Sequence, residues 1–372
     1  MTVQGAEADM TWANYLANKH FGTLDGLRFI SIVAVVGFHV EPELLFGLFK
    51  RGFLGVDLFF VISGFLITTL LLREQQTAGK ISLRQFYIRR TLRIFPLYYA
   101  ILFGLIVLLL LLAAIGKSPS FAPSFWHYLP YNLTFLANWV IQPGLLNTLW
   151  SLATEEQFYL VCPLMLKYLP RWLTVVLLTL FLVGNQLVNF GVLDYWIYTE
   201  WDAPPTLYIL QCTYTPLILG VFLGFALHHP GGYRVFQYLT VGRFGSMVWL
   251  ATLYALMILC PSDLSGWPRL SIQLVMMLLV AASVRDERHH LSHLLRWGPV
   301  VYVGKISYGI YLLHLFSMAV ASRLLQKLEW ETAGLQTALT LLLSIVAAGI
   351  SFRYLEQPFL KLRTRFTPPR NG

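Results

Sequence analysis

Long runs of apolar residues restrict what this chain can fold into. A helix needs about 20 mainly apolar residues to cross the hydrocarbon core of a bilayer, and the 372-residue chain holds several such runs between short polar segments. Charged residues make up 12% of the chain, about half the fraction found in soluble domains. We therefore predict an all-α, polytopic membrane helix bundle.

Hydropathy predicts ten spans, of which the fourth is the least apolar because it carries two glutamates and a proline. We expect a transmembrane domain over residues 23–363, an N-terminal segment over 1–22 without a cleavable leader, and a basic tail over 364–372. The spans are predicted at residues 24–42, 52–72, 94–115, 147–169, 172–189, 206–227, 243–260, 268–284, 299–324 and 334–355.

Lysines and arginines gather in alternate loops, which predicts the orientation in the membrane. One loop holds several of them between Arg73 and Arg93, whereas the loop 190–205 has none. With the basic loops inside, both termini lie in the cytoplasm. Arg28 is then near the cytoplasmic face, and His39 is in the outer half of the membrane.

The remaining composition argues against several classes of site. The net charge of +9 comes from loops between spans, so orientation explains it and nucleic-acid binding is not expected. Cys162, Cys212 and Cys260 are far apart, which disfavours a disulfide or metal framework. A solvated cytoplasmic loop explains His289, His290 and His293 better than a zinc site does, so we expect no metal.

The first span carries ionisable side chains at both ends, Arg28 and His39. Ionisable residues inside spans are costly and indicate function. Eleven residues of helix separate the two by about 16 Å along the axis. A histidine at this depth is either a helix-end residue with one hydrogen bond or a general base for an acceptor hydroxyl.

Two adjacent carboxylates, Glu155 and Glu156, follow Trp150 in the fourth span. Neighbouring helical residues point about 100° apart, so we expect the two not to serve one partner equally. They form either a structural ion pair with a residue such as an arginine or the carboxylate that orients His39. Either glutamate fits that second role.

Arg90 and Arg93 precede the third span and share a helix face if the helix has already begun. Such residues commonly anchor the cytoplasmic end of a span on anionic lipid. Two guanidiniums at a helix N-terminus also suit the phosphates of CoA, a lipid or a nucleotide.

Polar residues also mark the second and ninth spans. Asp57 needs a partner, for which Lys50, Arg51 or His39 are candidates, whereas Ser63 and Gly64 favour close helix packing. In the ninth span a polar stripe faces either a cavity or another helix. It consists of Ser307, Tyr311 and His314.

Six motifs in order resemble the membrane acyltransferase-3 family, over about residues 22 to 363. They are Arg28 with His39, the Gly55–Phe65 segment, Arg90 with Arg93, Trp150–Tyr159, Ser307–His314 and Glu356–Phe359.

The resemblance implies an integral membrane O-acyltransferase, in a bacterial inner membrane, that uses acyl-CoA. Acetyl-CoA, the usual donor, would bind with its phosphates near Arg90 and Arg93, and we group Arg28 and Tyr98 with these donor contacts. His39 would be the base, with Glu155 and Glu156 beside it. A glycan or glycolipid acceptor would meet residues that we assign to substrate binding, namely Asp57, Ser63, Trp150, Tyr311 and His314.

Some family members carry a fused extracellular hydrolase-like domain. Because the sequence ends at the basic tail, we expect transfer to finish in the membrane domain or with a separate partner. Two alternatives stay open: a transporter for a glycan or lipid-linked glycan, since buried His, Glu and Arg also suit proton coupling, and a non-catalytic assembly or sensor protein.

Overall fold

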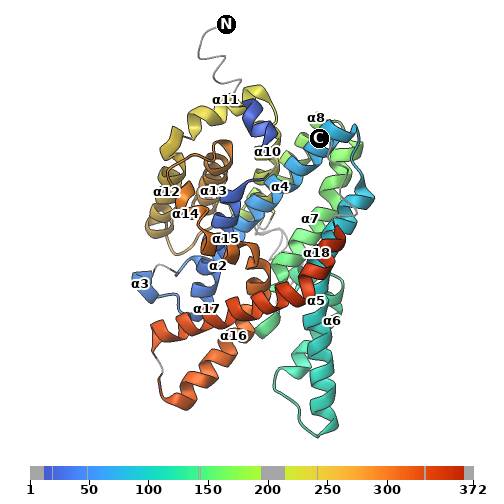
Figure 1. The fold of residues 1–372 in the computed structure, drawn as a ribbon, viewed down its shortest axis with the longest axis vertical. Coiled ribbons are helices and arrows are strands. Elements are labelled where there is room, and N and C mark those ends of the chain that lie inside the picture. The colour runs from blue at the N-terminus through green and yellow to red at the C-terminus, as the bar shows by residue number, and fades with distance from the viewer. Residues whose placement is uncertain are drawn as a thin grey trace. The chain divides into compact units, whose positions relative to one another are not determined.

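The structure is a computed structural model, and it describes residues 12–18, 20–47, 49–140, 142, 144–193, 214–240, 242–330 and 332–363. Helices and their connections account for all of these residues, and no strand occurs among them (Figure 1). The predicted all-α polytopic class is therefore confirmed. Cys212, the first part of the sixth span, residues 1–11 and the tail 364–372 lie outside the described residues.

The chain divides into two compact units, which we call unit 1 and unit 2. The divisions fall inside long helices or at their junctions, near Arg73, Leu169 and Ser307. Unit 1 consists of Met1–Arg73, Leu169–Ala203 and Leu210–Ser307, and unit 2 consists of Glu74–Tyr168, Pro204–Ile209 and Tyr308–Gly372.

Unit 1 is built around a core of aliphatic residues, of which Leu27, Val61 and Leu279 are fully buried. The first helix, α2, packs on α15, and α10 packs on both α8 and α13. Its helices are α2 (Gly22–Val40), α3 (Leu44–Gly47), η1 (Gly52–Leu54), most of α4 (Gly55–Ala78), α8 (Arg171–Asn189), α10 (Thr215–Leu227), α11 (Pro230–Leu239), η5 (Gly242–Phe244), α12 (Gly245–Leu259), α13 (Trp267–Arg285), α14 (Ser292–Leu295) and α15 (Gly298–Lys305).

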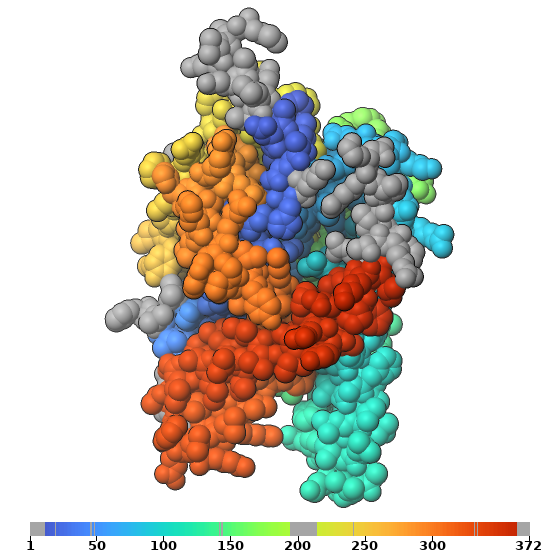
Figure 2. All heavy atoms as spheres, in the orientation of Figure 1, coloured from blue at the N-terminus to red at the C-terminus, as the bar shows by residue number. Residues whose placement is uncertain are grey.

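Unit 2 is organised by its longest helix, α5, against which α6 and α18 pack. In Figure 2 the teal atoms of α6 and the adjoining end of α5 form one mass at the lower right. The unit consists of α5 (Leu83–Ala114), α6 (Ala122–Leu133), η2 (Ala137–Trp139), η3 (Gly144–Leu146), α7 (Leu149–Tyr168), α16 (Ser307–Leu328), α17 (Ala333–Ser351), a π-helix η6 (Phe352–Glu356) and α18 (Gln357–Arg363).

Eight of the described helices are long and apolar enough to cross a membrane. The other two predicted spans correspond to α7 and α10. The 20-residue helix α7 contains Glu155, Glu156 and Gln157, which lower its hydropathy, and α10 has only 13 residues among those described.

Two predicted boundaries are wrong. The third span was expected to begin at residue 94, but α5 begins at Leu83, because the polar first turns are helical although they are not apolar. The ninth span was expected to be continuous, but α15 ends at Lys305 and α16 begins at Ser307. Arg90 and Arg93 consequently lie inside α5 rather than at its N-terminus.

Small residues let α4 and α10 approach closely in unit 1. A methyl group at Gly64 would collide with the carbonyl oxygen of Leu217, and one at Gly220 would collide with that of Val61. Small residues at matched positions are a common way to pack membrane helices. The packing expectation for Gly64 is therefore confirmed.

We expect Gly64→Ala to destabilise the protein, because overpacking a close helix crossing costs about 1–3 kcal/mol. Gly104→Ala is the matched control: nothing lies within 4 Å of a Cβ there, and alanine favours the helix by up to about 1 kcal/mol. The unfolding temperatures of both variants in one detergent test this. Equal stability of the two would contradict the crossing.

Candidate active site

The two ionisable residues of the first span lie on one uninterrupted helix, as predicted. In α2 the Arg28 Nη1 is 3.5 Å from the Oδ1 of Asp25, one turn earlier. Asp25 is buried, and its other oxygen is 3.9 Å from the exposed His20. Asp25 therefore neutralises part of the Arg28 charge within unit 1.

His39 lies in the last turn of α2 and is half-buried. Its Nδ1 is 2.9 Å from the carbonyl oxygen of Val35, one turn earlier. A carbonyl oxygen only accepts hydrogen bonds, so Nδ1 carries the proton in this contact. In the neutral ring the lone pair is then on Nε2, which is the nitrogen that can take a proton.

Asp57 is fully buried at the start of α4 and pairs with α13. Arg269 contacts both carboxylate oxygens of Asp57: its Nη2 donates to Oδ1 at 3.1 Å, and its Nε lies 3.0 Å from Oδ2. The side-chain amide of Gln273 also donates to Oδ2 of Asp57, at 3.0 Å. The partners that we predicted from sequence are thus wrong. Lys50 pairs with Glu43, and Arg51 donates to the carbonyl groups of Cys260 and Pro261.

In unit 2, Arg90 is held by three side chains of α7. Its guanidinium stacks on the ring of Tyr159 at 3.6 Å. It also lies 3.7 Å from Glu155 Oε2 and 3.5 Å from Glu156 Oε1. The Tyr159 hydroxyl donates to the other oxygen of Glu155 at 2.7 Å.

This cluster corrects the expectation that adjacent glutamates could not share a partner equally. A guanidinium is planar and wide enough to meet two carboxylates at once. The structural ion pair, one of the two roles that we left open, is therefore present for both Glu155 and Glu156. A role of either glutamate in orienting His39 stays a prediction, as does phosphate binding by Arg90.

One turn further along α5, Arg93 interacts electrostatically with Glu356. Glu356 is buried in the π-helix and accepts a hydrogen bond from the Ser351 hydroxyl at 3.2 Å.

Tyr98 is also buried on α5. Its hydroxyl donates to the carbonyl of Asn132 at 2.7 Å, and its ring stacks on Phe135. Tyr98 therefore joins α5 to the end of α6.

The residues that we assigned to substrate binding in unit 2 are mostly buried against helices. Tyr311 donates to the Thr148 carbonyl at 3.0 Å, and a 2.7 Å hydrogen bond joins its hydroxyl to that of Ser151. His314 is fully buried, and its Nδ1 donates to the Tyr311 carbonyl at 2.7 Å. At Tyr311 the polar stripe therefore meets another helix. Trp150 in this unit and Ser63 in unit 1 are half-buried, and their substrate roles stay predictions.

Comparison with known proteins decides the family. The family model described as an acyltransferase domain matches residues 21–352. The chain belongs to the acyltransferase-3 family. The predicted family is thereby confirmed, and the match covers five of the six motifs, all except Glu356–Phe359.

Relatives in the acyltransferase-3 family include the O-acetyltransferase OatA of Staphylococcus aureus strain NCTC 8325. The two are 29% identical over 383 residues, which cover 95% of this chain and 60% of that protein. OatA of strain COL matches with the same identity and coverage. The chain thus spans about 60% of the length of these relatives. No solved structure matches it.

One expectation outside the family motifs is corrected in unit 1. We placed His289 in a solvated loop, but it is 1% exposed, and its Nδ1 is 2.6 Å from the Ser246 hydroxyl at the start of α12. Burial lowers its pKa to about 4, because charging the ring there would require desolvation.

Sequence reasoning missed Arg269, Gln273 and Tyr159. A signal for the first two was present: Arg269 is an ionisable residue inside a predicted span, and Gln273 is four residues later on the same helix face. Tyr159 lies in a quoted motif, but its role depends on where α5 packs.

Asp57→Ala should destabilise the acyltransferase domain strongly. Removing one partner of a buried ion pair costs about 3–5 kcal/mol, because the other charge is left unpaired. Glu43→Ala is the control, since it breaks a pair with Lys50 that is mostly exposed and contributes about 1 kcal/mol at most. Thermal unfolding in one detergent measures both, and similar losses would contradict a structural role for Asp57.

His289 should make the stability of unit 1 depend on pH. Its folded pKa of about 4 lies below the ordinary 6.5, so its contribution is complete above pH 6.5 and is lost as the pH falls towards 4, by an amount on the order of 3 kcal/mol. His289→Gln should flatten the unfolding temperature over this range. His293→Gln, which changes an exposed histidine, should leave the pH dependence intact. The assignment fails if His289→Gln titrates like the parent.

Proposed function

We propose that this chain is an integral membrane O-acyltransferase. It moves an acetyl group from acetyl-CoA to a hydroxyl of a glycan or glycolipid on the outer side of the membrane, with His39 as general base. Family membership supports acyl transfer, and the printed name of OatA supports O-acetyl transfer. The CoA donor, the glycan acceptor and the base are our assignments.

The contact between His39 and Val35 carries the proposal. A general base needs an unprotonated nitrogen in a defined direction. The hydrogen bond from Nδ1 to the Val35 carbonyl sets the tautomer and orients the ring, so that Nε2 is the basic nitrogen. The same kind of bond joins His228 to the Gly224 carbonyl at the end of α10, so the contact supports the base by leaving Nε2 basic, and the activity of His39→Ala decides between the two roles.

We propose a direct transfer, with a covalent acyl-histidine formed on Nε2 as the competing route. The acceptor hydroxyl gives its proton to Nε2 of His39 while its oxygen forms a bond to the thioester carbonyl carbon. The tetrahedral intermediate then collapses: the carbon–sulfur bond breaks, the acetyl ester is released, and the CoA sulfur takes the proton back from the imidazolium. Atoms and charges balance without a metal or a redox partner.

Arg28 fits the donor better than it fits the reacting carbonyl. It is about 16 Å from His39 along the axis of α2, which is too far to contact the same tetrahedral centre. It has the charge to meet an anionic part of CoA, and we assign it that role together with Arg93. Arg90 lies between Glu155 and Glu156 and holds α5 against α7, and we keep it with Arg93 as a donor contact.

His39→Ala should lower acetyl transfer by at least about 100-fold, the usual contribution of a general base. The dissociation constant for acetyl-CoA should stay within about twofold, because His39 acts at the reacting end of the donor. Transfer of labelled acetyl groups to de-O-acetylated envelope glycan, by protein purified into nanodiscs, measures the first quantity; equilibrium binding measures the second.

His293→Ala is the control for loss of any histidine and should behave as the parent. Parental transfer by His39→Ala would refute the base. A parent protein that is intact but does not bind acetyl-CoA would refute the donor and favour transport of a glycan.

A further inference from the structure

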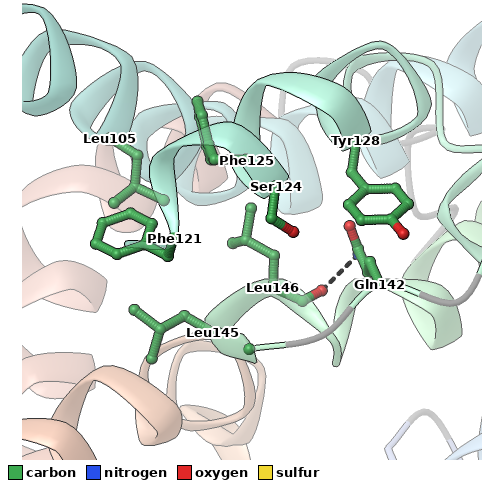
Figure 3. A pocket seen from close by; sticks show the side chains of 9 residues that line it. Leu105, Phe121, Ser124, Phe125, Tyr128, Gln142, Leu145 and Leu146 are labelled. Atoms are coloured by element: carbon green, nitrogen blue, oxygen red, sulfur yellow. Dashed lines mark hydrogen bonds between the residues drawn. The ribbon is translucent and has the colours of Figure 1, made fainter. Parts of the chain in front are cut away.

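A ring-sized pocket lies in unit 2 between the distal half of α5, α6 and the segment around η3. Its volume is about 120 Å³, close to the roughly 150 Å³ of an apolar cavity that binds benzene. Figure 3 shows the side chains around it. The lining residues are Leu105, Phe121, Ser124, Phe125, Tyr128, Gln142, Gly144, Leu145 and Leu146.

The polar wall of the pocket is held rigidly. Gln142 and Asn132 form a reciprocal amide pair, with bonds of 3.0 and 3.1 Å, and Gln142 also donates to the Leu146 carbonyl. Both amide protons of Gln142 are then used, and its oxygen keeps one lone pair for a ligand. Tyr98 fixes the carbonyl of Asn132, so the wall is tied to α5.

The helix α6, with the residue before it, supplies four lining residues in one stripe. Phe121, Ser124, Phe125 and Tyr128 are three or four residues apart, so they share a face. Within the described part of the chain, neither the Ser124 nor the Tyr128 hydroxyl has a hydrogen-bond partner. The pocket thus offers aromatic faces, two hydroxyls and one amide oxygen, and none of its lining residues is charged.

We propose that this pocket binds one uncharged sugar ring of the acceptor. A sugar ring has faces of C–H groups, which pack on the negative faces of aromatic rings, and edges of hydroxyls, which suit Ser124, Tyr128 and Gln142. An acyl chain would offer no hydrogen bond to the two hydroxyls or to the buried Gln142 amide oxygen, whereas a sugar would. A phosphate or an acidic sugar would meet no cation.

The position of the pocket agrees with an acceptor site. Leu105 is twelve residues beyond Arg93 on α5, or about 18 Å along the helix. The pocket therefore lies towards the end of α5 opposite its arginines, which is the outer end in the proposed orientation. This assignment rests on the proposed function.

Leu145→Trp would fill the pocket, and Tyr128→Phe would remove one hydroxyl. We expect the half-saturating concentration of de-O-acetylated envelope glycan to rise at least about 10-fold in Leu145→Trp. In Tyr128→Phe the half-saturating glycan concentration should rise about 5-fold, because one lost hydrogen bond costs about 1 kcal/mol. Acetyl-CoA affinity should stay within twofold in both. Tyr131→Phe, on the same helix but outside the pocket, is the matched control and should change neither.

Unchanged half-saturation in both pocket variants would overturn the assignment. So would a parallel loss of acetyl-CoA affinity, or a selective loss of longer acyl-CoA donors, because either would make the pocket a donor site. If Leu145→Trp fails to accumulate, the conservative Tyr128→Phe variant decides the question. A parent protein that binds acetyl-CoA but does not acetylate the glycan would instead refute the proposed function.

Discussion

A charge inside an apolar helix bundle has to be neutralised, and this requirement determines how the helices of unit 2 are joined. Arg90 of α5 is met by Glu155, Glu156 and Tyr159, all from one face of α7. Removing one partner would leave a buried charge, at a cost of several kcal/mol. The cluster therefore fixes the rotation of α5 relative to α7 at the level of Arg90.

Unit 1 also joins two helices by a buried ion pair, but here the acidic residue is on the earlier helix. There the buried acid, Asp57, is on α4, and the cation is Arg269 of α13. Close packing at Gly64 then holds α4 against α10. Ion pairs set which helices meet and small residues set how closely they meet, and α2, which carries His39, packs on α13 within the same unit. The proposed base depends on this packing for its direction.

Hydropathy predicted the helices well because the signal is local, whereas the partners of charged residues are not local. Asp57 bonds a residue 212 positions away, and its choice depends on the rotation of two helices that hydropathy does not specify. The early start of α5 was missed for a related reason, since apolarity marks only the part of the helix that suits lipid. The tautomer of His39, in contrast, depends on a carbonyl one turn earlier and could have been inferred once the helix was predicted.

The length of α5 explains why one helix can contribute to both sides of the proposed reaction. Its 32 residues extend about 48 Å, well beyond the roughly 30 Å hydrocarbon core. Arg93 and Leu105 are about 18 Å apart on this helix, so the arginine and the pocket lie at different depths of the same helix. Within unit 2, the proposed donor would place its charged end at Arg93, and the proposed acceptor would enter at the level of Leu105, further along the same helix. One helix of this unit can therefore reach both proposed sites.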